Sequence, residues 1–201
     1  MFISRMRNFI LCKIMLRIDE VDKRILSLLA ENSELSQSEI GRFLKMSQPA
    51  VAARLRKLKQ RGIIMHQVGV NLRKTKLGFV RVDVSTNNSG EILKLFEKCP
   101  LFLNGFVTSG NRNLCLFLVS EDLASLDACI DRHVRANPNV SDVEFSVVLS
   151  SARDFISPLK MIREKAEFSP CGGRCEKCSY YKSKRCLGCP STIYYKGVLF
   201  G

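Results

Sequence analysis

The sequence predicts an α+β protein made of an N-terminal winged helix-turn-helix, a ferredoxin-like βαββαβ domain and a small Cys-rich module. Three observations lead to this prediction: helical periodicity between residues 18 and 62, alternating strand and helix patterns from 79 to 151, and five cysteines between 171 and 189. The expected boundaries are an N-terminal extension at 1–17, the helix-turn-helix at 18–75, the βαββαβ domain at 76–155, and a linker with the Cys-rich tail at 156–201.

The N-terminal extension mixes basic and apolar residues in the stretch MFISRMRNFILCKIMLR. Lys13 and Arg17 interrupt its apolar character, and it lacks the small-residue cleavage site of a secretory signal. We therefore expect either that Met15 is the true start, so that residues 1–14 are untranslated, or that the extension at 1–17 is disordered.

Two helices are expected before residue 46. In the first, Val21, Ile25 and Leu28 recur at helical spacing behind a group of acidic residues, which stabilise a helix N-terminus. The second begins with the Ser-x-x-Glu pattern of a capping box, formed by Ser36 and Glu39. Its inward-facing residues are expected to be Ile40, Phe43 and Leu44.

The third helix is expected from Ser47 to Arg61 and has the character of a DNA-recognition helix. Its apolar face consists of Val51, Leu55 and Leu58, which leaves small and basic side chains on the other sides. Small residues let a helix approach the floor of the major groove, while Arg and Lys reach phosphates or guanine edges. Only two residues separate this helix from the second, which is the spacing of a helix-turn-helix.

The predicted DNA contacts come from this helix and from the segment that follows Gly62. Ser47, Gln48 and Arg54 lie toward the helix N-terminus, the end that usually reads base edges. The segment after Gly62 is typical of a short β-ribbon, a wing with basic residues at its end. The full set of candidates is Ser47, Gln48, Ala53, Arg54, Lys57, Lys59, Arg61, Arg73 and Lys74.

The charge distribution supports a polyanion as the partner of the N-terminal domain. The formal net charge of +13 divides into +10 for residues 1–78, −3 for residues 79–159 and +6 for residues 160–201. A basic module beside a mildly acidic one is expected when the first meets nucleic acid and the second meets protein or a small ligand.

The middle of the chain alternates strand and helix patterns. Strands are expected at 79–86, 101–110, 111–120 and 140–151, and helices at 89–100 and 123–138. The order βαββαβ implies a four-stranded antiparallel sheet with both helices on one face.

The first two domains resemble the Lrp/AsnC family of bacterial and archaeal transcription regulators. The matching features are the Ile-Asp-x-x-Asp-x-x-Ile-Leu opening, the Ser-x-x-x-Val-x-x-Arg-x-x-x-Leu recognition helix and the Gly-Ile-Ile exit, followed by the βαββαβ segment, over residues 18–153. The resemblance implies a homodimer formed by pairing of the sheets, and often a higher oligomer. It also implies binding to pseudo-palindromic promoter DNA, with half-sites about one helical turn or a multiple of it apart.

The resemblance also suggests an effector site. Family members commonly sense an amino acid near a Thr-Gly-x-x-Asp turn, which corresponds here to TSGNRN. The candidate effector residues are Gly110, Asn111 and Asn113. Asn113 stands where Asp is usual, and an amide cannot offer the same charge to an ammonium group. The alternative is that Gly110 is only a hairpin residue that requires positive φ.

The C-terminal cysteines have the spacing of metal ligands. Two Cys-x2-Cys pairs allow four sulfurs to face one ion, and nearby glycines supply freedom for tight loops. The candidate metal ligands are Cys171, Cys175, Cys178, Cys186 and Cys189. Zinc would use the last four and leave Cys171 over, whereas an iron-sulfur cluster could recruit it. Zinc is favoured slightly, on frequency alone.

The sequence argues against catalysis. The two histidines, His66 and His133, belong to no catalytic grouping, and there is no phosphate-binding Gly-rich loop. The nine cysteines, without a secretory signal, indicate a reducing cytoplasm. The sequence therefore predicts a DNA-binding transcription regulator rather than an enzyme. The alternative is a metal-dependent adaptor that docks onto the transcription machinery.

Overall fold

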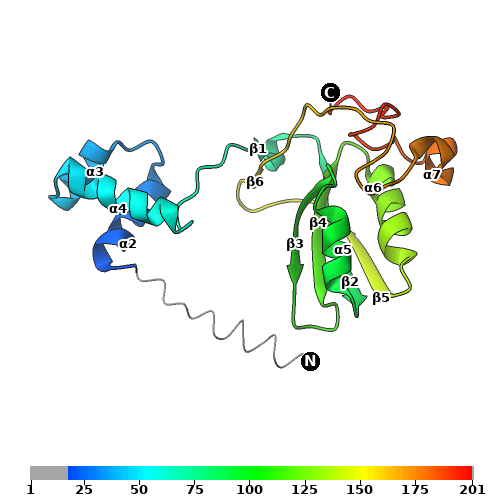
Figure 1. Cartoon of the computed structure of the whole chain (residues 1–201), viewed down its shortest axis with the longest axis horizontal. Coiled ribbons are helices and arrows are strands. Elements are labelled where there is room, and N and C mark those ends of the chain that lie inside the picture. The colour runs from blue at the N-terminus through cyan, green and yellow to red at the C-terminus, as the bar shows by residue number, and fades with distance from the viewer. Residues whose placement is uncertain (1–17, 201) are drawn as a thin grey trace. The chain divides into compact units, whose positions relative to one another are not determined.

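The computed structural model describes residues 18–200, which fall into two compact units divided between His66 and Gln67. The first unit contains the helices α2 (Glu20–Glu31), α3 (Gln37–Leu44) and α4 (Gln48–Gln60) (Figure 1). The predicted boundary at residue 75 therefore lies inside the second unit. The extension predicted at 1–17 is outside the described residues.

The three helices of the first unit enclose a small apolar core. Its buried members are Ile25, Ile40, Val51, Leu55 and Leu58. They come from all three helices at the predicted spacing, so burial of one stripe per helix holds the unit together. The prediction that Phe43 also points inward is wrong, because its side chain is 64% exposed.

Local sequence sets the ends of these helices. The predicted capping box at Ser36 is confirmed: Ser36 Oγ accepts from the backbone N–H of Glu39, and Glu39 Oε2 accepts from the backbone N–H of Ser36 at 2.8 Å. Asp19 and Asp22 form a second box at the start of α2. Gly62, with φ of 67°, follows α4 in the left-handed region that suits glycine.

The predicted β-ribbon after Gly62 does not form a local hairpin. Residues 63–69 have no regular secondary structure, and β1 (Val70–Asn71) pairs instead with β6 (Ile156–Ser157) in the second unit. Gly69 permits this approach, since a Cβ there would lie 2.7 Å from Ile156 Cγ2. A short turn of 3-10 helix, Leu72–Lys74, follows β1.

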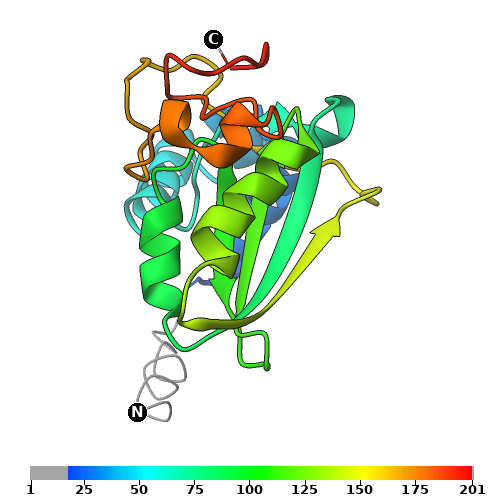
Figure 2. The ribbon, with the colours of Figure 1, turned by 90° about the vertical axis from the view of Figure 1, so that its right-hand side faces the viewer.

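The second unit is the predicted ferredoxin-like fold. Its elements are β2 (Gly78–Thr86), α5 (Ser89–Phe96), β3 (Phe102–Val107), β4 (Leu114–Ser120), α6 (Leu123–Ile130) and β5 (Val140–Val147). The strands are antiparallel in the order β3-β4-β2-β5. Both helices lie on one face of the sheet (Figure 2), where buried valines and leucines of β2 and β4 face them.

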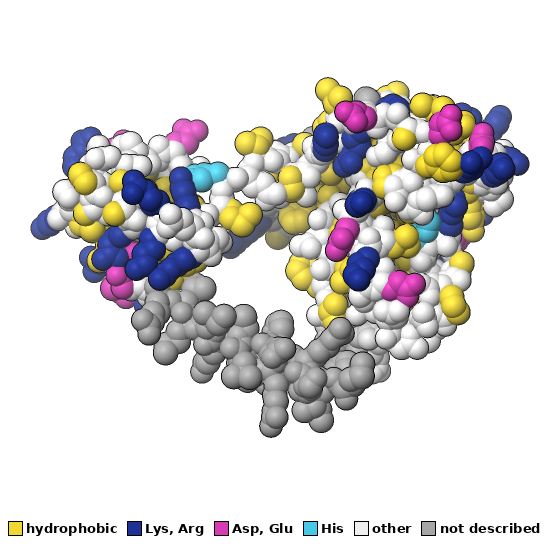
Figure 3. Space-filling model, in the orientation of Figure 1, with side chains coloured by type: hydrophobic (Ala, Val, Ile, Leu, Met, Phe, Trp, Pro, Cys, Tyr) yellow, Lys and Arg dark blue, Asp and Glu magenta, His cyan; other side chains and the backbone are white. Residues whose placement is uncertain are grey.

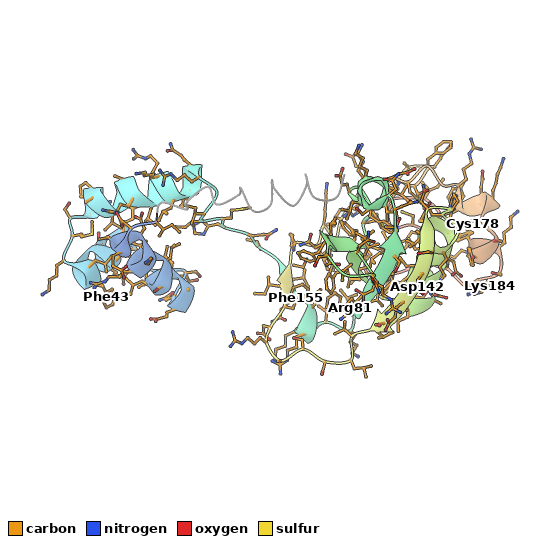
Figure 4. All side chains as sticks on the ribbon, turned by 90° about the horizontal axis from the view of Figure 1, so that it is seen from below. Phe43, Arg81, Asp142, Phe155, Cys178 and Lys184 are labelled. Atoms are coloured by element: carbon orange, nitrogen blue, oxygen red, sulfur yellow. The ribbon has the colours of Figure 1, made fainter. Side chains whose placement is uncertain are left out.

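The C-terminal tail is part of this second unit. It carries a 3-10 turn at Cys175–Lys177 and the short helix α7 (Ser179–Lys182). Figure 4 shows Cys178 and Lys184 on this segment, at the opposite end of the unit from Phe155. Phe200 is only 2% exposed and belongs to the same apolar cluster as the sheet. The tail is thus folded against the domain and shares its core.

Candidate nucleic-acid interface and Cys-rich tail

Helix α4 presents a cationic surface to solvent. Four basic side chains on the helix or directly after it are exposed: Arg56, Lys57, Lys59 and Arg61. Figure 3 shows Lys and Arg side chains gathered on the visible face of the first unit. Ala53 is exposed among them, so the backbone of α4 can come close to a groove. Arg56 was not among the predicted contacts, although it is exposed like Lys57 and Lys59.

The N-terminal end of α4 is also accessible. Ser47 is exposed at the N-cap position, and its side chain makes no capping hydrogen bond. Gln48 is exposed, and its Nε2 donates to Gln37 Oε1 at 2.6 Å. Both side chains can still form hydrogen bonds with a base edge or a phosphate, which a contact in the DNA groove would require.

Arg54 forms ion pairs within the first unit. Its Nη1 lies 2.5 Å from Asp19 Oδ2 and 2.8 Å from Asp22 Oδ1, so it ties α4 to the start of α2. Hydrogen bonds with these carboxylates raise the pKa of Arg54, and the Arg54 guanidinium lowers the pKa of Asp19. Both carboxylates contact Nη1, and the Arg54 side chain is 32% exposed, so its contact with a base edge stays a prediction.

Arg73 and Lys74 do not belong to the first unit. They lie in the 3-10 turn after β1, in the second unit, where Arg73 Nη1 is 3.7 Å from Asp154 Oδ1. The segment before them pairs with β6 instead of folding back on itself. Their predicted place at the end of a local wing is therefore wrong.

The predicted effector turn joins β3 to β4, and one of its residues is committed to the sheet. Asn113 Nδ2 donates to the carbonyl of Thr86 at 2.7 Å, and its Oδ1 accepts from the backbone N–H of Thr86 at 3.0 Å. Gly110 and Asn111 are exposed. Gly110 is not among the described glycines with positive φ, so the alternative explanation that depended on positive φ is wrong.

The tail is anchored on helix α6 and the loop before it. Glu121 Oε1 accepts hydrogen bonds from the Tyr195 hydroxyl and from the backbone N–H of Val198 at 3.0 Å. The backbone N–H of Leu187 donates to Ser125 Oγ at 2.8 Å. Burial of the Tyr195 hydroxyl and its bond to Glu121 raise the Tyr195 pKa. These contacts fix the tail across α6, as Figure 2 shows.

Backbone N–H groups point at two of the tail sulfurs. Cys189 N donates to Cys175 Sγ at 3.5 Å, and Gly188 N donates to Cys186 Sγ at 3.4 Å. The bond from Gly188 favours the charged form of Cys186, but burial outweighs it and raises the pKa of the Cys186 thiol. In residues 18–200, however, no three His, Cys, Asp or Glu side chains are placed to hold one metal ion.

Cys171 has a separate environment. Its Sγ lies 3.0 Å from Ser169 Oγ, and it interacts electrostatically with His133. Burial raises the pKa of the Cys171 thiol, but the bonds from His133 and Ser169 outweigh that effect and bring the pKa to about 6.

The cationic α4 in a helix-turn-helix unit, followed by a ferredoxin-like domain, defines a DNA-binding transcription regulator. A family model for winged helix-turn-helix DNA-binding matches residues 18–65, and one for the Lrp/AsnC ligand binding domain matches residues 77–156. The chain belongs to the Lrp/AsnC family of transcription regulators. Both matches end before the Cys-rich tail.

Known proteins agree with this assignment. The HTH-type transcriptional regulator Rv2324 of Mycobacterium tuberculosis is 27% identical over 148 residues, which cover 71% of this chain and 99% of that protein. The structure of AsnC from E. coli has a TM-score of 0.59 at 18% identity and covers 69% of this chain and 95% of its own. A structure of regulator NMB0573 from Neisseria meningitidis, titled as a complex with L-Met, has a TM-score of 0.54 at 21% identity. The match covers 67% of this chain and 92% of that chain.

The relatives are named as regulators, which confirms the prediction that the chain is not an enzyme. None of the helices at residues 18–200 has both the length and the apolar character needed to cross a bilayer.

Proposed function

We propose that this regulator binds pseudo-palindromic promoter DNA as a homodimer through α4 and adjusts its output through the effector domain and the metal-binding tail. The observation that carries DNA recognition is the exposed row of cations on α4, interleaved with Ala53. Lys57, Lys59 and Arg61 fit phosphate contacts, while Ser47 and Gln48 fit base-edge contacts.

Salt dependence of DNA binding tests this interface. Operator DNA is first selected in vitro with the full-length protein. Lys57→Ala is then expected to lower the magnitude of the slope of log affinity against log salt by about 1.8, because the dimer loses one phosphate contact in each of its two half-sites. Lys94→Ala, an exposed lysine on α5, is the matched control. An unchanged slope in Lys57→Ala would exclude this contact.

Dimerisation is supported by aromatic residues on the sheet face opposite the helices. Ring centroids are 5.9 Å apart for Phe106 and Phe117, 5.7 Å for Phe117 and Phe79, and 5.3 Å for Phe79 and Phe155. Phe106 is 49% exposed in the single chain. Such a patch favours burial against a second copy. Phe106→Asp is expected to shift the sedimentation coefficient toward the monomer.

An amino acid is the proposed class of effector. The match of residues 77–156 to a ligand binding domain supports an effector site, and the Neisseria protein with this fold was solved with L-Met. Gly110 and Asn111 remain available in the turn, whereas Asn113 is engaged with β2. Thermal-shift measurements with the amino acids, repeated on Asn111→Ala, test this proposal.

The tail cysteines are the proposed metal ligands, with zinc slightly favoured over an iron-sulfur cluster. Thiolate chemistry suits both, and backbone N–H groups face the sulfurs of Cys175 and Cys186. The sulfurs would have to converge further than they do in the structure. Elemental analysis and visible spectroscopy of anaerobically purified protein separate the two metals: a brown sample that bleaches in air indicates iron-sulfur, and a colourless one with stoichiometric zinc indicates zinc.

A further inference from the structure

The folded tail carries a concentration of positive charge on its outer side. Residues 171–200 contain six Lys or Arg residues and a single carboxylate, that of Glu176. Figure 4 shows Lys184 at the outer edge of the second unit. Five of the six cations are exposed on or beside α7, and we call them the tail cationic surface: Lys177, Lys182, Lys184, Arg185 and Lys196.

Carboxylates of the second unit do not neutralise this surface. Arg185 comes closest to an ion pair, with its Nη2 3.6 Å from Asp127 Oδ2. Asp127 already accepts a shorter bond from Arg135, at 2.8 Å. Within residues 18–200, none of the four lysines of the surface forms an ion pair with a carboxylate. Charges left unpaired in this way produce a positive potential that attracts a polyanion.

Attachment of the tail to the domain does not explain these cations. The tail is held by neutral donors, because the Tyr195 hydroxyl and the backbone N–H of Val198 both donate to Glu121. It is also held by burial of Phe200 in the main apolar cluster. A tail bound to a mildly acidic domain by its charge would turn its lysines toward the carboxylates of that domain. The lysines are exposed instead, so their charge remains available to a partner.

Two of the cations are held by aromatic rings, which do not cancel their charge. Arg185 Cζ lies 5.3 Å from the centroid of the Tyr180 ring, and Lys196 Nζ lies 4.4 Å from that of Tyr181. A ring attracts a cation through its quadrupole but has no net charge. These contacts therefore restrict the position of the two cations and keep the surface positive.

Lys184 stands where the backbone favours glycine. It follows the C-cap of α7 with φ of 59°, in the left-handed region that glycine usually occupies after a helix. Lysine at this position adds charge to the surface at a cost in local conformation. The residue can therefore be changed to glycine without harm to the backbone, which makes it a sharp probe of the charge.

We propose that the tail cationic surface is a second DNA-binding site of this regulator, which contacts the phosphate backbone without regard to sequence. Lysine ammonium groups bind phosphates as point charges and read no base edge. DNA is the favoured polyanion because the first unit of the same chain binds it. The segment 61–69 joins the two units, so DNA held by α4 is at high effective concentration for the tail. The inference rests on DNA binding by the first unit, but the two sites share no residue.

The test measures the salt dependence of DNA binding by the full-length protein, on selected operator DNA with unrelated sequence on both sides. Lys184→Gly is expected to lower the magnitude of the slope of log affinity against log salt by about 1.8, because the dimer loses one phosphate contact from each copy. Lys182→Gln combined with Lys184→Gln is expected to lower it by about 3.6. Lys182→Arg combined with Lys184→Arg keeps the charge and is expected to keep the slope. Lys94→Gln, on α5, is the control outside the surface.

Urea unfolding separates the loss of a contact from the loss of the fold. Lys184→Gly is expected to unfold at a urea concentration no lower than that of the wild type, because glycine suits the left-handed backbone. A lower slope in this stable variant supports the site. Lower slopes only in variants that unfold at lower urea concentrations would overturn it.

The outcomes differ from those for α4. Unchanged slopes in the tail variants, with a lower slope in Lys57→Ala, overturn the second site and leave recognition by α4 intact. The reverse pattern supports the second site and contradicts the Lys57 contact. A changed sedimentation coefficient with unchanged slopes would assign the surface to contact between copies and overturn the proposal. Loss of affinity for single-stranded RNA alone, measured with the same variants, would also overturn it.

Discussion

Replacement of Arg54 by methionine is expected to destabilise the helix-turn-helix unit. The guanidinium binds two carboxylates, and the Asp22 side chain is only 9% exposed, whereas that of Arg54 is 32% exposed. Exposed ion pairs contribute about 0.2–1 kcal/mol, and hydrogen bonds to charged groups about 1.5–3 kcal/mol. The intermediate burial predicts a loss of about 2 kcal/mol. Methionine keeps much of the apolar stem, so the change isolates the charge.

Hydrogen exchange in the full-length protein measures this loss where it occurs. Amides of α2 and α4 are expected to exchange about thirtyfold faster in Arg54→Met, while those of the sheet are unchanged. Lys57→Met is the matched control on the same helix. It is expected to change protection by less than about 0.5 kcal/mol, because Lys57 is exposed, yet to weaken DNA binding.

A double-mutant cycle gives the decisive result. Arg54→Met is combined with Asp22→Asn, and a coupling energy of about 1–2 kcal/mol is expected for residues in direct contact. Coupling within about 0.3 kcal/mol of zero would refute the role of this ion pair in the unit. A large loss of DNA affinity in Arg54→Met with unchanged hydrogen exchange would instead support Arg54 as a DNA contact.

Three other predictions follow from single contacts. The bond from Arg54 lowers the pKa of Asp19 from its ordinary 3.8, so the stability that Asp19 contributes is present above pH 3.8 and is lost as the pH falls through the folded-state pKa. Hydrogen exchange of the α2 amides should therefore become faster in acid. This pH dependence should be weaker in Arg54→Met. Asn113→Ala, which removes both bonds to Thr86, is expected to cost about 1–2 kcal/mol in urea unfolding, and Asn113→Asp more, because a carboxylate would face the Thr86 carbonyl. Phe200→Ala is expected to cost about 3 kcal/mol and to make the tail sensitive to limited proteolysis, with Val198→Ala, 93% exposed, as the control.

The predictions that succeeded rest on local sequence. The capping box at Ser36, the glycine after α4 and the apolar stripe through Val51 depend on residues within one or two helical turns. The order of strand and helix patterns likewise predicted the antiparallel sheet and its two helices. The prediction that failed, a local wing ending at Arg73, concerns a segment whose strand partner, Ile156–Ser157, lies far away in sequence.

The sequence by itself determined the order of helices and strands, the recognition helix and the family, because periodicity, caps and turns depend on residues that are close together in the sequence. Only the tertiary structure decided that Arg54 faces Asp19 and Asp22, across separations of 35 and 32 residues. It also decided that the tail buries Phe200 in the core of the ferredoxin-like domain and brings Cys171 near His133. Such contacts depend on how distant segments pack against each other, and the spacing of residues along the chain does not determine that packing.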